Sequence, residues 1–182
     1  MLIFVAGVHG VGKGFLCNNY IKNSNVLHKS ASQLIRENSN ITLTDNKLTS
    51  GMEQNQKILI AALDKLKSEN KILLLDGHFS LVSKYGEVKK LSSSVFKSIN
   101  IDMVVLIENT KDIITKRIIE RDNSEPAYDI EELIKAESEN ANSICTELNI
   151  PLIRLMSPTL NEFNDIIDGI RREIEPGAFK SL

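Results

Sequence analysis

The chain has 182 residues, of which 42% are apolar, and this length suits one sizeable hydrophobic core better than two. Its 22 Lys and Arg residues face 24 Asp and Glu residues, so a formal net charge of −2 gives no general attraction to nucleic acid. Cys17 and Cys145 lie far apart without metal-ligand spacing, and no apolar run approaches the length of a membrane span. Because the first apolar run starts at Leu2 and leaves no room for a signal peptide, we expect a cytoplasmic protein without a membrane partner.

The first predicted element is a buried strand over residues 2–6, and the motif G-x-x-x-x-G-K follows it directly. Its glycines let the backbone turn around a polyphosphate with N–H groups pointing inward, while Lys13 supplies a positive charge. A helix that begins near Gly12 adds its N-terminal dipole at the same point. The alternative is a glycine-rich turn that binds nothing. We expect an ATP-binding loop made of Gly7, His9, Gly10, Val11, Gly12, Lys13, Gly14 and Phe15.

One position in the loop departs from the usual motif. The residue after the lysine is normally Ser or Thr, whose hydroxyl binds Mg²⁺, but Gly14 and then Phe15 stand there. Any Mg²⁺ must therefore be held by nucleotide phosphates, by waters and by an acidic group from elsewhere in the chain.

Apolar runs and helical periodicity continue along the rest of the chain. Runs without alternation are typical of parallel strands that are covered on both faces, and apolar residues three and four apart are typical of helices. In chain order we predict a helix at 15–22, a short strand at 26–28, helices at 30–37 and 52–69, strands at 72–75 and 103–107, helices at 111–121 and 130–148, a weaker strand at 151–156 and a helix at 161–173. Residues 38–51 and 79–94 are expected to be mobile loops. The pattern predicts an α/β fold: a three-layer α-β-α sandwich with a mainly parallel sheet, as in P-loop NTP hydrolases and kinases.

Asp76 ends a buried strand, so we expect it at the same sheet edge as the phosphate loop. A carboxylate there can hold Mg²⁺ through water, although an Asp followed by Gly can also serve only to cap a turn. Two residues later, His78 is a candidate to orient an acceptor or a water, or to act as a base, and the alternative is a hydrogen bond within the turn.

Arg117 and Arg121 are spaced i, i+4 near the end of a predicted helix, so both project to one side of it. Guanidinium groups are natural partners of phosphate, and we expect these two to neutralise charge during phosphoryl transfer. The alternative is ion pairing with nearby acidic residues or a favourable charge at a helix C-terminus.

Four segments carry a family resemblance that spans residues 1 to about 155. They are Gly10-x-Gly12-Lys13-Gly14, the segment from Ser30 to Arg36, Leu74-Leu75-Asp76-Gly77-His78, and Arg117-x-x-x-Arg121. The chain resembles the adenylate kinase group of nucleoside monophosphate kinases, in the short-lid form of archaeal adenylate kinases and compact eukaryotic nuclear enzymes. The resemblance implies that Arg36, with Ser32 and His78, binds the acceptor, and that Arg36 contacts its phosphate.

The chain also departs from that family. Bacterial adenylate kinases have a Thr where this chain has Phe15, and a Pro-Arg pair after the segment that resembles 74–78, where Phe79-Ser80 stands here. The further lid arginines are also missing from residues 122–126. With fewer fixed cations, either the acceptor differs from AMP or turnover is slow.

Taken together, the sequence predicts a single P-loop kinase domain over residues 1–176 with a short tail at 177–182. It would contain an acceptor-binding insert at about 30–68 and a short lid at about 121–129. The predicted activity is transfer of the γ-phosphoryl group of ATP, with Mg²⁺, to a nucleoside monophosphate. Lys13, Arg117, Arg121 and Asp76 would be catalytic.

Two alternatives remain open. One is a P-loop kinase for a different small acceptor, and the other is a nucleotide-binding regulatory or assembly protein with slow ATPase activity and a protein partner. A nucleic-acid end kinase is the weaker third option, because it would need a basic channel. The identity of the acceptor, its base and sugar, and the oligomeric state are left open by the sequence.

Overall fold

The computed structural model describes residues 1–39, 51–69, 72–83 and 85–174. The elements in chain order are β1 (Leu2–Ala6), α1 (Lys13–Tyr20), a 3₁₀ turn (Ile21–Asn23), β2 (Leu27–Ser30), α2 (Ala31–Asn38), α3 (Gly51–Glu69), β3 (Leu73–Gly77), β4 (Ser80–Val82), β5 (Val88–Lys90), α4 (Ser93–Ile99), β6 (Met103–Glu108), α5 (Lys111–Asp122), α6 (Ile130–Leu148), β7 (Leu152–Met156) and α7 (Leu160–Ile174).

The main sheet has five strands in the order β2-β3-β1-β6-β7, and each neighbouring pair is parallel. All five residues of the central strand β1 are buried, which explains why its sequence is apolar without alternation. The strand order reverses on either side of β1, and ligands in such sheets bind beyond the carboxyl ends of the strands at this reversal. The predicted α/β sandwich is confirmed.

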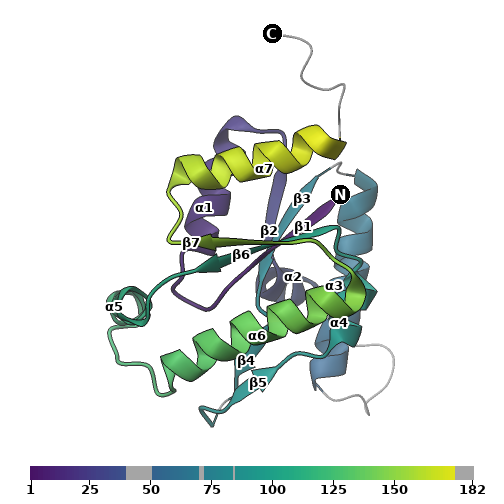
Figure 1. The fold of residues 1–182 in the computed structure, drawn as a ribbon. Helices are drawn as coiled ribbons and strands as arrows, with labels where there is room; N and C mark the ends of the chain where they lie inside the picture. The colour runs from purple at the N-terminus through teal and green to yellow at the C-terminus, as the bar shows by residue number, and fades with distance from the viewer. Residues whose placement is uncertain (40–50, 70–71, 84, 175–182) are drawn as a thin grey trace.

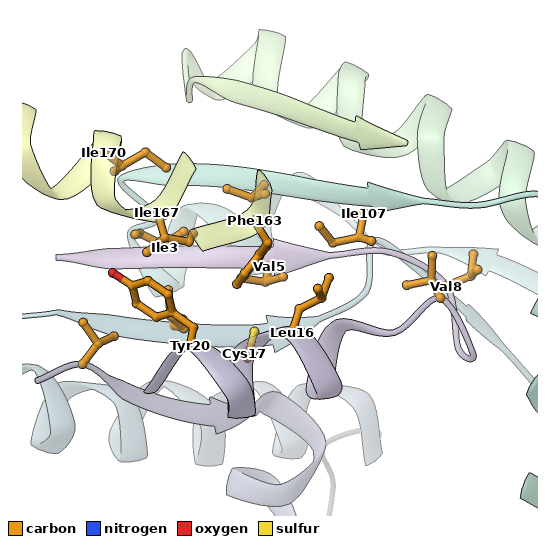
Figure 2. Packing of buried hydrophobic residues seen from close by; sticks show 14 of the residues in the cluster. Ile3, Val5, Val8, Leu16, Cys17, Tyr20, Ile107, Phe163, Ile167 and Ile170 are labelled. Carbon is orange, nitrogen blue, oxygen red and sulfur yellow. The ribbon is translucent and has the colours of Figure 1, made fainter. Parts of the chain in front are cut away.

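Helices cover both faces of the sheet, with α1 and α7 on one side and α3, α4 and α6 on the other (Figure 1). One apolar cluster lies beneath α1 and α7, and a second lies beneath α3, α4 and α6. Figure 2 shows part of the first cluster, including Ile3 and Val5 of β1, Leu16, Cys17 and Tyr20 of α1, and Phe163, Ile167 and Ile170 of α7. Within the described residues, no helix combines the length and the apolar content needed to cross a membrane.

Helix boundaries follow from local capping. Asp129 precedes α6 and accepts hydrogen bonds from the backbone N–H groups of Glu131 (2.8 Å) and Glu132 (3.3 Å), as an N-cap carboxylate does. Asn123 and Asn149 end α5 and α6 with φ of 52° and 53°, the left-handed conformation typical of a helix C-terminus. The boundaries of these two helices were therefore predictable to within one or two residues.

The prediction that 79–94 is a mobile loop was wrong. This segment contains the antiparallel hairpin β4–β5 and the first residues of α4. Its strands have only three residues each and are rich in Ser and Lys, so they carry too little apolar pattern to be predicted. Most of the other predicted mobile loop, 38–51, lies outside the described residues.

The weaker strand prediction at 151–156 was correct, and its Arg154 has a structural explanation. β7 is an edge strand of the sheet, so its side chains are only partly covered. The Arg154 guanidinium donates to both carboxylate oxygens of Glu108 on the neighbouring strand β6.

Candidate nucleotide and acceptor site

The loop between β1 and α1 has the backbone shape that its glycines allow. Gly7, Gly10 and Gly12 have φ of 141°, 80° and 110°, which residues with a side chain rarely adopt. At Gly7 a Cβ would also lie 2.4 Å from the carbonyl oxygen of Ile107, on the adjacent strand β6. The loop can therefore form only with glycine at this first position.

Lys13 begins α1, and its side chain turns back into the loop. The residue is only 7% exposed, and Nζ donates to the carbonyl oxygens of Gly7 (2.5 Å) and Val8 (3.2 Å). Burial lowers the pKa of Lys13 to about 8, against the opposing attraction of Asp76 and Glu137. The positive charge is thus enclosed beneath the loop rather than held out in solvent.

The two predicted arginines of α5 are held differently. Arg117 Nη1 donates to the carbonyl oxygens of Val11 (2.8 Å) and Gly10 (3.4 Å), so it braces the phosphate loop from outside. Arg121 makes two 2.7 Å hydrogen bonds to the carboxylate of Asp122, the next residue. In the structure, therefore, two of the five N–H donors of Arg121 are taken by Asp122.

A cavity of about 440 Å³ lies over the loop. It is lined by Val8, His9, Gly10, Gly12, Lys13, Gly14, Phe15, Ser30, Ser32, Asp76, His78, Arg117 and Arg121. Most of the predicted ATP-binding residues are in this set. Two are not: the side chain of Val11 packs into the core, and Gly7 lies behind the loop surface. We refer to this space as the phosphate cavity.

A second cavity, of about 350 Å³, lies beside the first between the sheet edge, α2, α3 and the β4–β5 hairpin. Its wall is mainly apolar, from Phe4, Ala31, Ile35, Leu59, Leu81, Leu91, Val95, Phe96 and Ile99, with Asn55 and Gln56 adding amide groups from α3. Four residues line both cavities: Ser30, Ser32, Asp76 and His78. We call this second space the apolar cavity, and it adjoins the phosphate cavity at these four residues.

Asp76 stands where the two cavities meet, one residue before the end of β3. Its Oδ2 is 2.8 Å from Nε2 of His28 on the adjacent strand β2, and Nδ1 of His28 is 2.9 Å from Oδ1 of Asn18 on α1. The carboxylate is thus held in place from β2. Sequence reasoning missed His28, because its partner Asp76 is 48 residues away in the sequence, although their strands are adjacent in the sheet.

His9 and His78 pack against each other in the phosphate cavity, with ring centroids 4.0 Å apart. Partial burial and the nearby charges of Lys13 and Arg121 lower the pKa of His9 to about 4. Burial, followed by Lys13 and His9, keeps the pKa of His78 well below its ordinary value. Both rings are therefore neutral at pH 7, and His78 is unlike an exposed turn histidine.

Sequence reasoning missed Glu137 of α6 as well. Its carboxylate is 2% exposed and accepts backbone hydrogen bonds from Gly7 (3.0 Å), Phe79 (2.9 Å) and Ser80 (2.6 Å). Burial raises the pKa of Glu137, while the bonds from Phe79 and the charge of Lys13 act in the opposite direction. The sequence held one signal for this residue: Glu137 lies at helical spacing from the apolar residues Leu133, Ala141 and Ile144, on the buried face of α6.

The predicted acceptor residues are only partly brought together. Ser32 and His78 line both cavities, but Arg36 lies exposed on α2 and lines neither of them. As for metal binding, within the described ranges no group of three or more His, Cys, Asp or Glu side chains could hold a metal ion.

Comparison with known proteins agrees with this geometry. The family described as AAA domain matches residues 6–135, which is more than half of the chain. The chain belongs to the AAA domain family. This matched region of the AAA domain holds the phosphate loop, Asp76 and the arginines of α5, which supports a nucleotide-binding P-loop domain, whereas Glu137 lies two residues beyond it.

Two solved structures have a similar fold. An uncharacterised protein from Eubacterium ventriosum aligns with a TM-score of 0.50 and 12% identity over 93% of this chain and 97% of that chain. A sugar kinase from Janibacter sp., solved without ligand, aligns with a TM-score of 0.54 and 12% identity over 91% of each chain. At this identity the likeness concerns the fold alone. A search of curated proteins finds no match.

Proposed function

We propose that this AAA domain protein is an ATP-dependent kinase that transfers the γ-phosphoryl group of ATP to a small acceptor in the apolar cavity. The observation that carries the proposal is the pair of adjoining cavities, one over a phosphate loop and one apolar, with four shared lining residues. A donor in the first and an acceptor in the second would meet at Asp76 and His78. The fold shared with the Janibacter sugar kinase is compatible with this arrangement.

Phosphoryl transfer depends mainly on positioning and on cations around the transferred group. Lys13 would leave the carbonyl oxygens of Gly7 and Val8 and follow the β- and γ-phosphates. Arg117 is already fixed at the edge of the loop, and Arg121 would release Asp122 to neutralise developing charge. Residues 121–129, which comprise the last two residues of α5 and the segment after it, would act as a short lid that excludes water.

Among the described residues that line the phosphate cavity, Asp76 is the carboxylate, and this fits the way proteins hold Mg²⁺, which keeps several waters and binds substrate phosphates. Asp76 would hold the ion through water, and His28 would fix the orientation of that carboxylate. When bound, Mg²⁺ supplies positive charge to the β- and γ-phosphate oxygens.

A nucleoside monophosphate is the acceptor that the family resemblance implies. Its base would suit the apolar cavity, where the amide groups of Asn55 and Gln56 can hydrogen-bond to a base edge. Its phosphate would lie at the junction near Ser32, and Arg36 would have to turn inward from its exposed position to reach it.

An acceptor with a neutral hydroxyl is the second candidate, and Asp76 favours it. In this alternative the Asp76 carboxylate at the junction would accept a hydrogen bond from the hydroxyl group of the acceptor and help remove its proton. Nucleosides and sugars belong to this class.

The test is ADP release from Mg-ATP in the presence of ribo- and deoxynucleoside monophosphates, the corresponding nucleosides, and simple sugars. We expect one class to stimulate turnover, and Lys13→Ala to abolish the stimulation. Lys135→Ala, which removes an exposed lysine from the outer side of α6, is the matched control and should keep it. If the protein binds ATP but no acceptor stimulates ADP release, the proposed kinase activity is contradicted, and a nucleotide-binding regulatory role is favoured.

A further inference from the structure

Helix α6 points two buried polar side chains at the backbone of distant segments. Glu137 is 2% exposed and Asn140 is 8% exposed, and they lie three residues apart on the same face of the helix. Glu137 accepts the N–H groups of Gly7, Phe79 and Ser80, and Asn140 Nδ2 donates to the carbonyl oxygens of Phe79 (2.7 Å) and Leu91 (2.9 Å). One helix face thus holds the phosphate loop and the β4–β5 hairpin at the same time.

The hairpin end of this connection forms a wall of the apolar cavity. The backbone of Phe79 is bound on both sides, through its N–H to Glu137 and through its carbonyl to Asn140 and to the N–H of Leu91 (2.9 Å). Leu81 and Leu91 line the cavity, and the Phe79 ring packs against the rings of Phe4 and Phe96. A shift of Phe79 and Ser80 would therefore change the shape of the cavity.

The other end lies where nucleotide would bind. Gly7 donates its N–H to Glu137, and its carbonyl oxygen accepts from Lys13 Nζ at 2.5 Å. When Lys13 turns to a phosphate group, the Gly7 carbonyl loses this donor. The residue whose N–H contacts Glu137 is thus also the residue whose carbonyl bonding would change when a nucleotide binds.

We propose that Glu137 is a positioning residue that couples nucleotide binding at the phosphate loop to the shape of the apolar cavity. Through it, a bound nucleotide would order the wall formed by β4–β5 before an acceptor enters. The proposal rests on the proposed nucleotide site and does not depend on which acceptor is used.

The chemistry of the contact explains why a carboxylate is needed. Three backbone N–H groups converge on the two oxygens of Glu137, and both oxygens act only as acceptors. In Glu137→Gln one oxygen is replaced by an NH₂ group, which would face N–H donors inside the protein. The side chain keeps its shape but loses the connection on one side.

The test is amide hydrogen exchange of the full chain with and without magnesium and a non-hydrolysable ATP analogue. In the wild type we expect the analogue to protect residues 7–14 and to slow exchange in the hairpin segment 79–91 by about fivefold or more, a typical size for coupled sites. In Glu137→Gln we expect residues 7–14 still to be protected, while the response of 79–91 is lost. Ile144→Val, which trims a buried methyl on the same helix, is the control for general destabilisation and should keep the response.

If Glu137→Gln fails to fold, Asn140→Ala provides the second variant, because it removes the side-chain donor to the carbonyl oxygens of Phe79 and Leu91 and leaves Glu137 in place. It should weaken the response of 79–91 without affecting 7–14. A full hairpin response in either folded variant, or none in the wild type, would overturn the inference. If the analogue does not protect residues 7–14 of the wild type, the proposed nucleotide site is contradicted as well. If the hairpin responds to the analogue but no acceptor stimulates turnover, only the proposed kinase activity is contradicted.

Discussion

Lys13 is a cation held almost entirely out of water, because it must lie beneath the phosphate loop to reach a nucleotide. Its ammonium group has two backbone acceptors in the described structure, at 2.5 and 3.2 Å, and no direct carboxylate contact among those described for it. Such burial disfavours the charged form, as the lowered pKa of about 8 indicates. The residue that the proposed function needs most is therefore one that destabilises the fold.

Because burial lowers the pKa of Lys13, the stability of the fold should depend on pH. Between pH about 8 and 10.5 the side chain is neutral in the folded protein and charged in the unfolded chain. The unfolded state then binds more protons, so the free energy of unfolding rises with pH across this window, by up to about 3 kcal/mol. Below pH 8 both states are charged and Lys13 adds no slope.

The measurement is urea unfolding of the wild type and Lys13→Met at pH 7.5, 9 and 10. Since Met fills similar space without charge, the variant should be the more stable protein at pH 7.5, and the difference should shrink as the pH rises. A Lys13→Met protein that is less stable than the wild type at pH 7.5 would contradict this account. Nucleotide binding should be lost in the variant at every pH.

At the scale of elements, the β4–β5 hairpin connects the apolar cavity with the segment that follows α5. Its turn contains Gly86, which has φ +84° and whose Cβ, if present, would lie 2.9 Å from the carbonyl oxygen of Ala127. The tip of the hairpin therefore lies against the proposed lid at 121–129. The two elements that would enclose the substrates are in contact with each other.

We predict that Gly86→Ala lowers the free energy of unfolding by about 1–3 kcal/mol, because it adds left-handed strain and a close contact with backbone. It should also increase proteolytic cleavage within 121–129. Gly169→Ala is the matched control: Gly169 lies inside α7, and a Cβ there would have no neighbour within 4 Å outside its own helix, so this variant should gain about 0.5–1 kcal/mol. Unfolding in urea and limited proteolysis measure both, and equal effects of the two substitutions would refute the explanation.

The sequence predicted well those elements that have a clear local signal, either an unbroken apolar run or a helix cap. β1, β3 and β6 are unbroken apolar runs, and α6 has a strong N-cap at Asp129, so their positions were clear. β4 and β5 are short and partly polar, and α6 holds them through bonds that local pattern does not contain, from Ser80 N–H to Glu137 and from Lys90 to Glu139. Tertiary contacts, rather than the β-propensity of these residues, therefore determine the position of this wall of the apolar cavity.

The residues of the candidate site also fall into two groups, those that a sequence motif identifies and those that only the fold brings together. Gly7, Gly12 and Lys13 belong to a motif whose spacing is fixed by the shape of a phosphate, so they could be found in the sequence. His28 and Glu137 act through partners 48 and 130 residues away, on Asp76 and Gly7, and no spacing rule connects them. The prediction that Arg36 binds the acceptor phosphate remains a prediction, with the side chain exposed on α2.

At the scale of the whole molecule, a ligand that binds only the folded state raises thermal stability. At a concentration one hundred times its Kd, Mg-ATP should add about 2.7 kcal/mol to the free energy of unfolding. For a chain of this length, the melting temperature should rise by roughly 5–10 °C. Scanning calorimetry with and without Mg-ATP measures the shift.

Lys13→Ala should show little shift at the same Mg-ATP concentration, and Lys135→Ala should behave like the wild type. This result would hold for a kinase and for a regulatory nucleotide-binding protein alike, so it tests the phosphate loop separately from the acceptor. Identical melting temperatures with and without Mg-ATP in the wild type would mean that the loop does not bind ATP.

The glycines of the loop also constrain how this protein can diverge. A side chain at Gly7 meets the main chain of Ile107, an obstacle that no second substitution removes, whereas one at Gly10 meets the side chain of Ile118, 2.9 Å away. Homologues should therefore be invariant at position 7 over any evolutionary distance. A smaller residue at position 118 would remove only that obstacle, because a Cβ at position 10 would also lie 3.2 Å from the carbonyl oxygen of Ile114 and the residue would have to adopt a φ of 80°.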